Sequence, residues 1–427
     1  MDREEKINIT SGVNLNTYFT DKFKTSILSV FIHTPLKKEQ TTVNRLLLKL
    51  LSSSSDKYKT AKLAEQKKAE LYGVSLSEGC IKNGDTQILS ISLDFIANSY
   101  TMNGEDLSAE VASFLMTLLT EPKFDENEYF YDEDIEREKR LLKNELEGIF
   151  NDKRKYALEK GISLLFKDEP YGVSVNGSID EIEKITKEDL KKAYFDLITT
   201  SAIEFIYVGE ESKTVETTIK SVFKNINRTP KITVLSDYYG KTVNFSSDCE
   251  KFDLTQSKIV MGFRAKTLFD EFDPKKYVIL NLMNAIFGGG TYSKLFMNVR
   301  EKESLCYYCS SQVITNRFAL IVQSGVEDKN VELAEKSILK EFENLKSGKI
   351  TDDELEFAKI AFDNMFRGFY DSPEMIESLL LHKSQIPGFE IVKLIDLSNE
   401  IEKEDLQKAA NEFEYSLKYE IRSQGNK

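Results

Sequence analysis

The chain has 427 residues, of which 41% are hydrophobic and 30% charged, and it carries a formal net charge of −13. This length suggests two or more domains with ample core, and the negative charge argues against nucleic-acid binding, which needs a basic face. No apolar run approaches the roughly 20 residues that span a bilayer, and the first residues are polar, unlike a signal peptide, so we expect a cytoplasmic protein without a membrane segment.

The first half of the chain shows alternating strand and helix patterns. Apolar residues alternate over 87–96, which is typical of a strand with one buried face, whereas they recur at i, i+3, i+4 and i+7 over 43–51, which indicates an amphipathic helix. The predicted elements are a strand at 25–34, helices at about 42–51 and 60–72, strands at 74–80 and 87–96, helices at about 105–120 and 127–168, a helix start at 186–190, and a strand ending at 210.

The second half repeats this order at a spacing of roughly 215–230 residues. We therefore predict an α+β fold of two duplicated domains, 1–230 and 245–427, each a mainly antiparallel sheet packed with helices, with the boundary within 226–245. The predicted elements are a strand at 257–265, helices at 274–287 and about 291–302, strands at 305–314 and 317–326, helices at about 330–346, 351–371 and 373–382, a helix start at 401–406, and a strand at 417–423.

Three consecutive glycines, Gly288, Gly289 and Gly290, separate two of the predicted helices. A phosphate-binding loop would need the pattern G-x-x-x-x-G-K-[ST] after a strand, whereas this run follows a helix. We interpret the run as a tight link between helices, whose backbone can still approach a bound peptide because no Cβ intervenes.

The four cysteines are Cys80, Cys249, Cys306 and Cys309, too few for a disulfide scaffold in a chain of this length. The last two form a C-x-x-C pair, which in a redox motif opens a helix whose dipole lowers a thiol pKa. Here the pair lies in a β-prone run over 304–314, where alternate side chains point to opposite faces. We therefore expect a structural role for the pair. No set of Cys and His residues has the spacing of a structural zinc site.

The segment after the glycines resembles the C-terminal substrate-binding segment of the M16 zinc proteases, the family of insulinase, pitrilysin and mitochondrial processing peptidase. Residues 295–307 read Leu-Phe-Met-Asn-Val-Arg-Glu-Lys-Glu-Ser-Leu-Cys-Tyr, similar to the family's Leu-Phe-x-x-Val-Arg-Glu-Lys-x-Gly-Leu-Ala-Tyr. Ser304 and Cys306 replace its Gly and Ala, and both are small. Residues 166–177 resemble the family's Phe-x-x-x-Pro-Tyr-Gly-x-x-x-x-Gly, and the resemblance covers nearly the whole chain.

The resemblance implies that Arg300 and Tyr307 bind substrate, because the family's Arg and Tyr have the same seven-residue separation and reach the scissile peptide. A guanidinium can anchor a peptide carbonyl, and a phenol can donate to a developing oxyanion. With the glycines at 288–290, these two residues form the expected substrate-binding set. The competing interpretation is a solvated helix arginine and an ordinary strand tyrosine.

The family's zinc motif, His-x-x-Glu-His, has no counterpart in this chain. The matching stretch, near Arg45 to Lys49, contains neither His nor Glu, and the chain has only two histidines, His33 and His382. A zinc peptidase needs two imidazoles, a carboxylate and a base that activates water. Glu145 resembles the family's third ligand, but without the histidines we interpret it as a helix-surface carboxylate. We interpret both histidines as structural or surface residues and expect neither metal nor cofactor in this chain.

The resemblance implies a non-catalytic, substrate-binding subunit of a heterodimeric M16B zinc peptidase. Its partner would be a catalytic subunit with His-x-x-Glu-His, whose zinc cleaves a peptide held partly by Arg300 and Tyr307. No hydrolysis is expected from the chain alone, and a homodimer of the isolated chain stays open. Two alternatives remain: a structural or peptide-holding M16-like protein without protease activity, and an enzyme with an unrecognised site. A neighbouring gene that encodes the zinc motif would favour the heterodimer.

Overall fold

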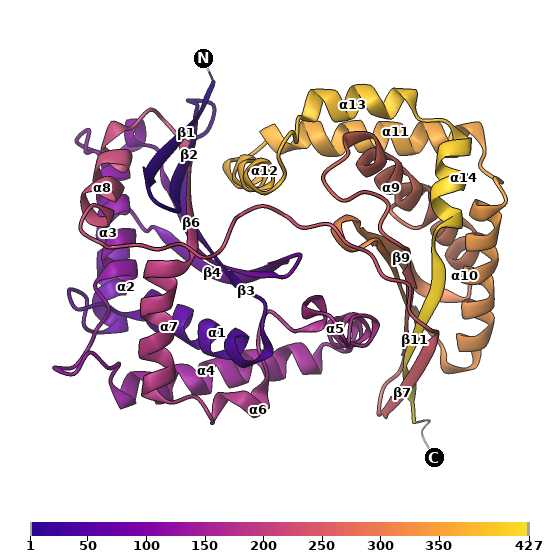
Figure 1. Ribbon diagram of the computed structural model, residues 1–427, viewed down its shortest axis with the longest axis horizontal. Coiled ribbons are helices and arrows are strands. Elements are labelled where there is room, and N and C mark those ends of the chain that lie inside the picture. Colours follow the sequence, from indigo (N-terminus) through magenta and orange to yellow (C-terminus); the bar gives the residue numbers. More distant parts are fainter. Residues whose placement is uncertain (1, 425–427) are drawn as a thin grey trace. The chain divides into compact units, whose positions relative to one another are not determined.

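Two units, each built from three stretches of the chain, make up the computed structural model, which describes residues 2–424 (Figure 1). The first unit contains the chain up to Glu147, Val173–Leu235 and Phe369–Gln385, and the second contains Gly148–Gly172, Ser236–Gly368 and the chain from Ile386. Two continuous domains, 1–230 and 245–427, were expected from the sequence. The difference lies in two short helical segments, 148–172 and 369–385, each of which packs within the unit formed mainly by the other half of the chain.

The first unit is a six-stranded sheet with helices on both faces. The strand order is β1-β2-β6-β3-β5-β4, and all neighbours are antiparallel except the parallel pair β2 and β6. Its strands are β1 (Arg3–Thr10), β2 (Val13–Phe19), β3 (Thr25–Pro35), β4 (Ser75–Asn83), β5 (Thr86–Ile96) and β6 (Ala202–Gly209). Its helices are α1 (Lys38–Ser53), α2 (Ala61–Glu70), α3 (Leu107–Thr120), most of α4 (Asp132–Asn151), α6 (Ile179–Ile182), α7 (Lys187–Thr200), α8 (Lys213–Phe223) and α12 (Pro373–Gln385).

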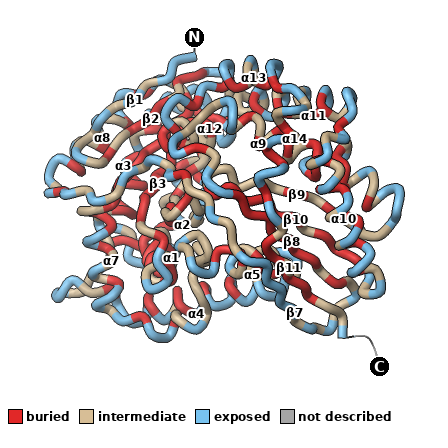
Figure 2. Tube along the Cα trace, turned by 45° about the vertical axis from the view of Figure 1, so that its right-hand side comes forward, coloured by how far each residue is buried: buried red, intermediate tan, exposed pale blue. Residues whose placement is uncertain are grey.

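The second unit is a five-stranded sheet in the order β7-β11-β8-β10-β9, again antiparallel except for the pair β7 and β11. Figure 2 shows that buried residues predominate along β8, β10 and β11, the inner strands of this sheet. Its strands are β7 (Ser246–Phe252), β8 (Ser257–Arg264), β9 (Cys306–Ile314), β10 (Ala319–Val326) and β11 (Glu414–Ser423). Its helices are α5 (Lys153–Leu165), α9 (Pro274–Phe287), α10 (Val331–Lys346), α11 (Asp352–Arg367), α13 (Ile391–Glu400), α14 (Lys403–Asn411) and the π-type segment η3 (Leu295–Lys302).

The duplicated α+β plan is confirmed by the two strand orders. Leaving out β1, the first sheet reads β2-β6-β3-β5-β4 and the second reads β7-β11-β8-β10-β9, with the one parallel pair in the same place. The hairpin that ends each sheet is β4–β5 in the first unit and β9–β10 in the second. Strand β9 is therefore the counterpart of β4, and each is the edge strand of its sheet.

The predicted helix over 127–168 is wrong in one respect, because two helices form there. The chain leaves helical geometry at Asp152, whose φ is −76° and ψ is 90°, and the Asp152 carboxylate accepts the backbone N–H groups of Arg154 and Lys155. This N-cap starts α5 in a new direction. Helix α5 then packs on β8 and β11, where Gly161 allows close approach, since a Cβ there would lie 2.6 Å from Val260.

Helix α12 packs on the sheet of the first unit, as α5 packs on the sheet of the second. Its apolar residues Ile376, Leu380 and Leu381 pack on a patch of strands β3, β5 and β6 that includes Ile27 and Ile206. The sheet of the first unit is thus covered by α12 on one face and by helices such as α1 and α3 on the other. Because both faces are covered, strand β3 is buried along almost its whole length.

Candidate functional site

In the first unit, the position expected for zinc holds a cluster of two basic and two acidic side chains. Arg45 and Lys49 lie one turn apart on α1, and both face Glu145 of α4 and Glu78 of strand β4. The Arg45 guanidinium lies 3.1 Å from Glu145 and 3.6 Å from Glu78. The Lys49 ammonium lies 2.5 Å from Glu145 and 2.9 Å from Glu78. The cluster joins α1, α4 and β4 by ion pairs.

The charges of this cluster do not suit a divalent metal. Burial opposes the charge of Lys49, whose side chain is 8% exposed, but the hydrogen bond to Glu145 and the charge of Glu78 outweigh burial and raise the pKa of Lys49. Two permanent positive charges therefore stand where two neutral imidazoles would be required. Within residues 2–424, no three His, Cys, Asp or Glu side chains are grouped so that they could hold a metal ion. The residues present do not fit zinc.

Glu145 is an exposed carboxylate on a helix, as expected from the sequence, and in addition it forms ion pairs. Its side chain is 45% exposed, yet both of its oxygens are engaged, one by Arg45 and the other by Lys49. The sequence contained the signal, since Arg45 and Lys49 match the helical spacing of the family's two histidines. Their pairing could not be foreseen without knowing that α4 lies against α1.

The two histidines lie apart from this cluster. His33 is buried on β3, and its Nε2 is 3.6 Å from the buried carboxylate of Glu204 on β6. Ser384 of α12 donates a hydrogen bond to the same carboxylate at 2.5 Å. His382, on α12, is half-buried and its Nδ1 is 2.7 Å from the carbonyl oxygen of Ser378. Their surroundings fit the structural interpretation of both side chains.

In the second unit, Arg300 and Tyr307 are brought together at the edge of the sheet. Arg300 comes from η3 and Tyr307 from the start of β9. The Arg300 Nε donates to the carbonyl oxygen of Tyr307 at 3.0 Å, its Nη1 pairs with Glu301 at 2.8 Å, and its guanidinium stacks 4.5 Å from the ring centre of Phe296. The Arg300 side chain thus contacts the backbone of Tyr307, and binding of substrate by the two side chains stays a prediction.

A β-bulge displays the Tyr307 side chain. In the pairing of β9 with β10, Tyr308 lies opposite Gly325 and Cys306 opposite Val326, so Tyr307 is an extra residue without a partner on β10. Bulges of this kind redirect a side chain and are frequent beside functional sites. The Tyr307 side chain is 53% exposed, and its hydroxyl is within hydrogen-bonding reach of the Glu327 carboxylate.

The turn between η3 and β9 is formed by Ser304, whose φ is +52°. This left-handed conformation favours glycine, which is the residue that the M16 pattern has at this place. From the sequence, Ser304 is only a small replacement for this glycine. The backbone shows that the replacement carries conformational strain between the two residues of interest.

The three glycines link α9 to the segment that carries Arg300. Gly288 caps α9 through its N–H, which donates to the Asn284 carbonyl at 2.9 Å, and its own carbonyl accepts from the Ser311 N–H of β9 at 2.9 Å. A Cβ at Gly288 would lie 2.6 Å from the Ser311 nitrogen, so the glycine allows α9 to contact the strand. The interpretation as a helix link fits these contacts, and a role of Gly289 and Gly290 in substrate binding stays a prediction.

The expectation for Cys306 and Cys309 needs a correction. Alternation along a regular strand would place these two side chains on opposite faces, but the bulge at Tyr307 adds one residue between them. They therefore share a face, and each thiol shifts the pKa of the other. A bulge is set by the pairing of β9 with β10 and leaves no signal in the spacing of the cysteines.

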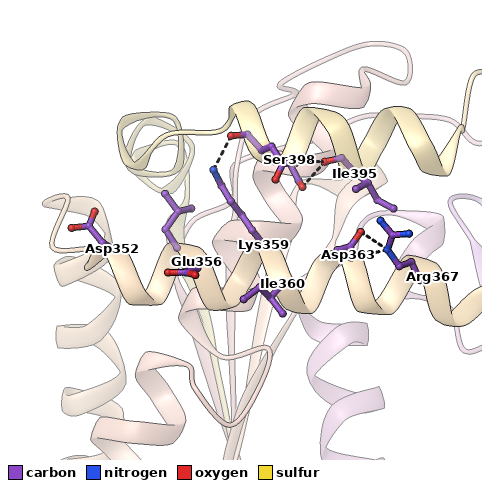
Figure 3. Close-up of a pocket in the computed structure, with 10 residues that line it drawn as sticks. Asp352, Glu356, Lys359, Ile360, Asp363, Arg367, Ile395 and Ser398 are labelled. Atoms are coloured by element: carbon purple, nitrogen blue, oxygen red, sulfur yellow. Dashed lines mark hydrogen bonds and ion pairs between the residues drawn. The ribbon is translucent and has the colours of Figure 1, made fainter.

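One surface groove of the second unit, of about 550 Å³, lies between α11 and α13 (Figure 3). Its polar groups are largely engaged with one another: the Lys359 ammonium donates to the Asn399 carbonyl at 3.0 Å, and Arg367 pairs with Asp363 at 2.8 Å. Neither Arg300 nor Tyr307 lines this groove. The groove is therefore separate from the candidate site on η3 and β9.

Comparison with protein families gives one match within the chain. Residues 184–362 match the family model described as the peptidase M16 inactive domain. A Bacillus subtilis (strain 168) protein named probable inactive metalloprotease YmfF is 29% identical over 414 residues, which are 96% of this chain and 95% of that protein. An uncharacterized zinc protease of Rickettsia felis is 24% identical over 306 residues, 68% of this chain and 70% of that protein.

Solved structures match over the whole length. The crystal structure of a conserved protein from Enterococcus faecalis V583 has a TM-score of 0.87 and 28% identity, covering 99% of each chain. The peptidase M16 inactive domain from Pseudomonas fluorescens has a TM-score of 0.78 and 17% identity, covering 100% of this chain and 99% of that one, and shows the fold alone. Among residues 2–424, no helix combines the length and apolarity that crossing a bilayer requires. The chain is therefore similar to M16 peptidases, through the inactive-domain match over residues 184–362 and a probable inactive relative over nearly the whole chain, and its sequence lacks the His-x-x-Glu-His motif.

Proposed function

We propose that this chain is the non-catalytic, substrate-binding subunit of a heterodimeric M16 zinc peptidase. Arg300 and Tyr307 act on a peptide whose scissile bond lies at the zinc of a catalytic partner, and this chain holds no metal of its own. The observation that carries the proposal is the exposed Tyr307, placed by a bulge beside Arg300, in a chain whose own zinc position is filled by Arg45 and Lys49.

The edge of β9 supports peptide binding. Backbone groups of Tyr307, Cys309 and Ser311 point to the open side of the sheet, because residues two apart along a strand share a direction. The Tyr307 carbonyl is engaged by Arg300 and the Ser311 N–H by the Gly288 carbonyl. Between these two contacts lies Cys309, on a strand that ends the described sheet. A peptide added along this edge would receive main-chain hydrogen bonds with little demand on its sequence.

Two groups must change partners when the peptide binds. The Arg300 guanidinium leaves the Tyr307 carbonyl for a peptide carbonyl, which its donor fork can hold. The Tyr307 hydroxyl leaves Glu327 and donates to the oxyanion that develops at the scissile bond. The carboxylate of Glu327 stays ionised without Tyr307, because the hydrogen bond from Lys329 and its charge lower the pKa of Glu327.

The test is reconstitution with an M16 chain that carries His-x-x-Glu-His. Each chain alone and the mixed pair are assayed with a fluorogenic peptide, and size-exclusion chromatography follows assembly. We expect hydrolysis only from the pair. A partner variant with its first motif histidine replaced by alanine is the control, and it should assemble without hydrolysis. Full activity of the partner alone, or no assembly with this chain, would refute the proposal.

A second candidate is a structural or peptide-holding M16-like protein without a protease partner. The observation that favours it is the state of Arg300, whose guanidinium is already engaged by Tyr307, Glu301 and Phe296. In that case the segment would serve to fasten η3 to β9. Peptide binding by the isolated chain, with no partner recovered from the native host, would favour this candidate.

A further inference from the structure

We propose that Cys306 and Cys309 form a reversible dithiol–disulfide pair, closed by small-molecule disulfides such as oxidised glutathione, whose closure moves Tyr307. The pair flanks the exposed tyrosine in the chain, with only Tyr307 and Tyr308 between the two cysteines. Its formation is a property of the strand β9 and needs no partner protein. Its effect on peptide binding rests on the function proposed above.

The first step is the position of the two side chains. Across the sheet, Cys306 lies opposite Val326 and Cys309 opposite Ser324, so on β10 only Gly325 separates their partners. Residues two apart on a strand share a face and lie about 6.7 Å apart. Disulfides usually join Cα atoms up to about 6.8 Å apart. The bulge therefore brings the pair to the upper limit of bridging distance, which a regular strand would exceed.

The second step is the contrast between the two thiols. Cys309 is 4% exposed, whereas Cys306 is half-buried and borders Arg300. The hydrogen bond from Cys309 lowers the pKa of Cys306 against the opposing effect of burial, and the charge of Arg300 adds to the lowering. The same hydrogen bond, together with burial, raises the pKa of Cys309 well above its usual range. Cys306 is thus the attacking thiol and Cys309 the resolving thiol.

The third step is the reaction, which is two successive thiol–disulfide exchanges. The Cys306 thiolate attacks one sulfur of oxidised glutathione, the S–S bond of glutathione breaks, and one glutathione thiolate leaves and takes up a proton. The Cys309 thiol then loses its proton and attacks the Cys306 sulfur, which expels the second glutathione. One protein disulfide and two reduced glutathione molecules result, and the protein loses two electrons and two protons.

The fourth step links the disulfide to Tyr307. Because the cysteines start at the upper limit of bridging distance, closure shortens the strand at the bulge, where Tyr307 is the unpaired residue. The carbonyl of Tyr307 accepts from Arg300, so a shift of this residue also disturbs the Arg300 contact. A disulfide closed under such strain is more easily reduced than a relaxed structural one, which suits a reversible switch.

The experiment uses the full chain in glutathione buffers of increasing oxidised fraction. Free thiols are counted, and the sites are mapped by differential alkylation and mass spectrometry. We expect two of the four thiols to disappear, both from Cys306 and Cys309, and to return with dithiothreitol. Cys80 and Cys249 serve as internal controls, since burial raises the pKa of both thiols, that of Cys80 to about 12. A Cys80→Ser/Cys249→Ser variant should behave as the native chain does.

Single variants distinguish the two roles. In Cys309→Ser, the mixed disulfide with glutathione should accumulate on Cys306, because the resolving thiol is gone. In Cys306→Ser, Cys309 should stay reduced. The proposal is overturned if all four thiols persist in the fully oxidised buffer, if Cys249 reacts before Cys306, or if Cys309 of Cys306→Ser reacts as fast as the native pair.

Hydrogen exchange and peptide binding test the consequence. Oxidation should change amide exchange over residues 300–311 in the native chain and leave Cys306→Ser/Cys309→Ser unchanged. Unaltered exchange in a chain whose disulfide has closed would overturn the movement of Tyr307. Peptide affinity should fall at least several-fold on oxidation. If peptide binds in neither redox state while the disulfide forms and exchange changes, the proposed function fails and the redox pair stands.

Discussion

The zinc position of the first unit and the Arg300–Tyr307 segment of the second unit differ in how the surrounding structure accommodates their residues. In the first unit, Arg45 and Lys49 are turned inward and neutralised by Glu78 and Glu145, so the charges serve packing. In the second unit, Tyr307 is left half-exposed on a bulged strand, next to a strained turn. Features that cost stability persist only where something else holds them in place, and they point to function. The first cluster joins α1, α4 and β4 by ion pairs, whereas the second segment has the exposure that the proposed contact with substrate requires.

Helices α5 and α12, each of which packs within the unit formed mainly by the other half of the chain, allow a second comparison. Helix α5 covers its sheet together with a charge that has a partner of opposite sign, since the buried Arg264 of β8 lies 2.9 Å from Glu169 just beyond the helix. Helix α12 covers its sheet with Glu377, which accepts a hydrogen bond from Ser29 and lies near two further carboxylates, Asp94 and Glu374. We therefore expect Glu377 to make the stability of the first unit depend on pH.

The largest effect on the stability of the chain is expected from Lys49→Ala, which leaves Glu78 and Glu145 without their shared ammonium. Removing one partner of a buried ion pair costs about 3–5 kcal/mol, and we expect about 3 kcal/mol because Glu145 is half-exposed. Urea unfolding measures the loss. Lys184→Ala, which breaks an exposed pair with Glu181, is the control and should cost below about 1 kcal/mol. Equal costs for the two variants would show that the cluster does not hold the unit together.

The largest effect on turnover is expected from Tyr307→Phe, measured in the reconstituted pair. Loss of an oxyanion donor lowers kcat by about 10²–10³-fold, or about 2.7–4 kcal/mol, so turnover should fall by that order while assembly is unchanged. Arg300→Ala should mainly raise KM, because it removes an anchor for the peptide. Size-exclusion chromatography checks assembly. Native kcat and KM in both variants would refute the proposed roles of Arg300 and Tyr307 and favour the structural candidate.

The double variant Arg45→His/Lys49→His tests whether the first unit keeps the frame of a metal site. Two imidazoles one turn apart on α1 would face Glu145, which gives the three protein ligands of a catalytic zinc centre. Zinc at 100 times its Kd should then stabilise the variant by about 2.7 kcal/mol and leave the native chain unaffected. Glu145→Gln in the double variant should abolish the gain. We expect no hydrolysis, because Leu48 stands where the motif has its glutamate.

A smaller effect is expected for Glu377→Gln, and it depends on pH. Burial raises the pKa of Glu377 to about 7, helped by the charges of Asp94 and Glu374 and opposed by the Ser29 hydrogen bond. The protonated carboxyl therefore stabilises the folded chain below the unfolded pKa, and this contribution is lost as the pH rises through about 7. Between pH 5 and pH 8, native stability should fall by roughly 2 kcal/mol more than that of Glu377→Gln.

Thermal unfolding of both chains at these two pH values measures the difference. Glu374→Gln, a charge change at an exposed position of the same helix, is the matched control and should have the smaller influence. Identical pH dependence of the native chain and Glu377→Gln would show that the Glu377 carboxyl titrates as an exposed group.

Local pattern predicted much of the fold and less of the site. Strands β3 and β5 lie within a residue or two of the expected 25–34 and 87–96, because alternation follows directly from a buried face. Strand β1 was missed, since its polar, exposed sequence shows no such alternation. The contacts of Glu145, the bulge at Tyr307 and the shared face of Cys306 and Cys309 depend on partners remote in the chain. No spacing rule within one segment contains that information.

The smallest effect is expected for Ser304→Gly, at the turn between η3 and β9. A left-handed φ of +52° is costly for any residue with a Cβ, so glycine should stabilise the folded chain. Two effects reduce this gain in stability. Glycine has greater freedom in the unfolded chain, and the Ser304 hydrogen bond to the Glu301 carbonyl is lost. We expect a net stabilisation of about 0.5–1 kcal/mol by urea unfolding. Ser310→Gly, within β9 and without a positive φ, is the matched control and should destabilise by a similar amount.

If Ser304→Gly also destabilises, the hydroxyl contact outweighs the strain. The turn beside Tyr307 would then be held by its serine, and the second unit would lose one of the two strained features that set it apart from the first.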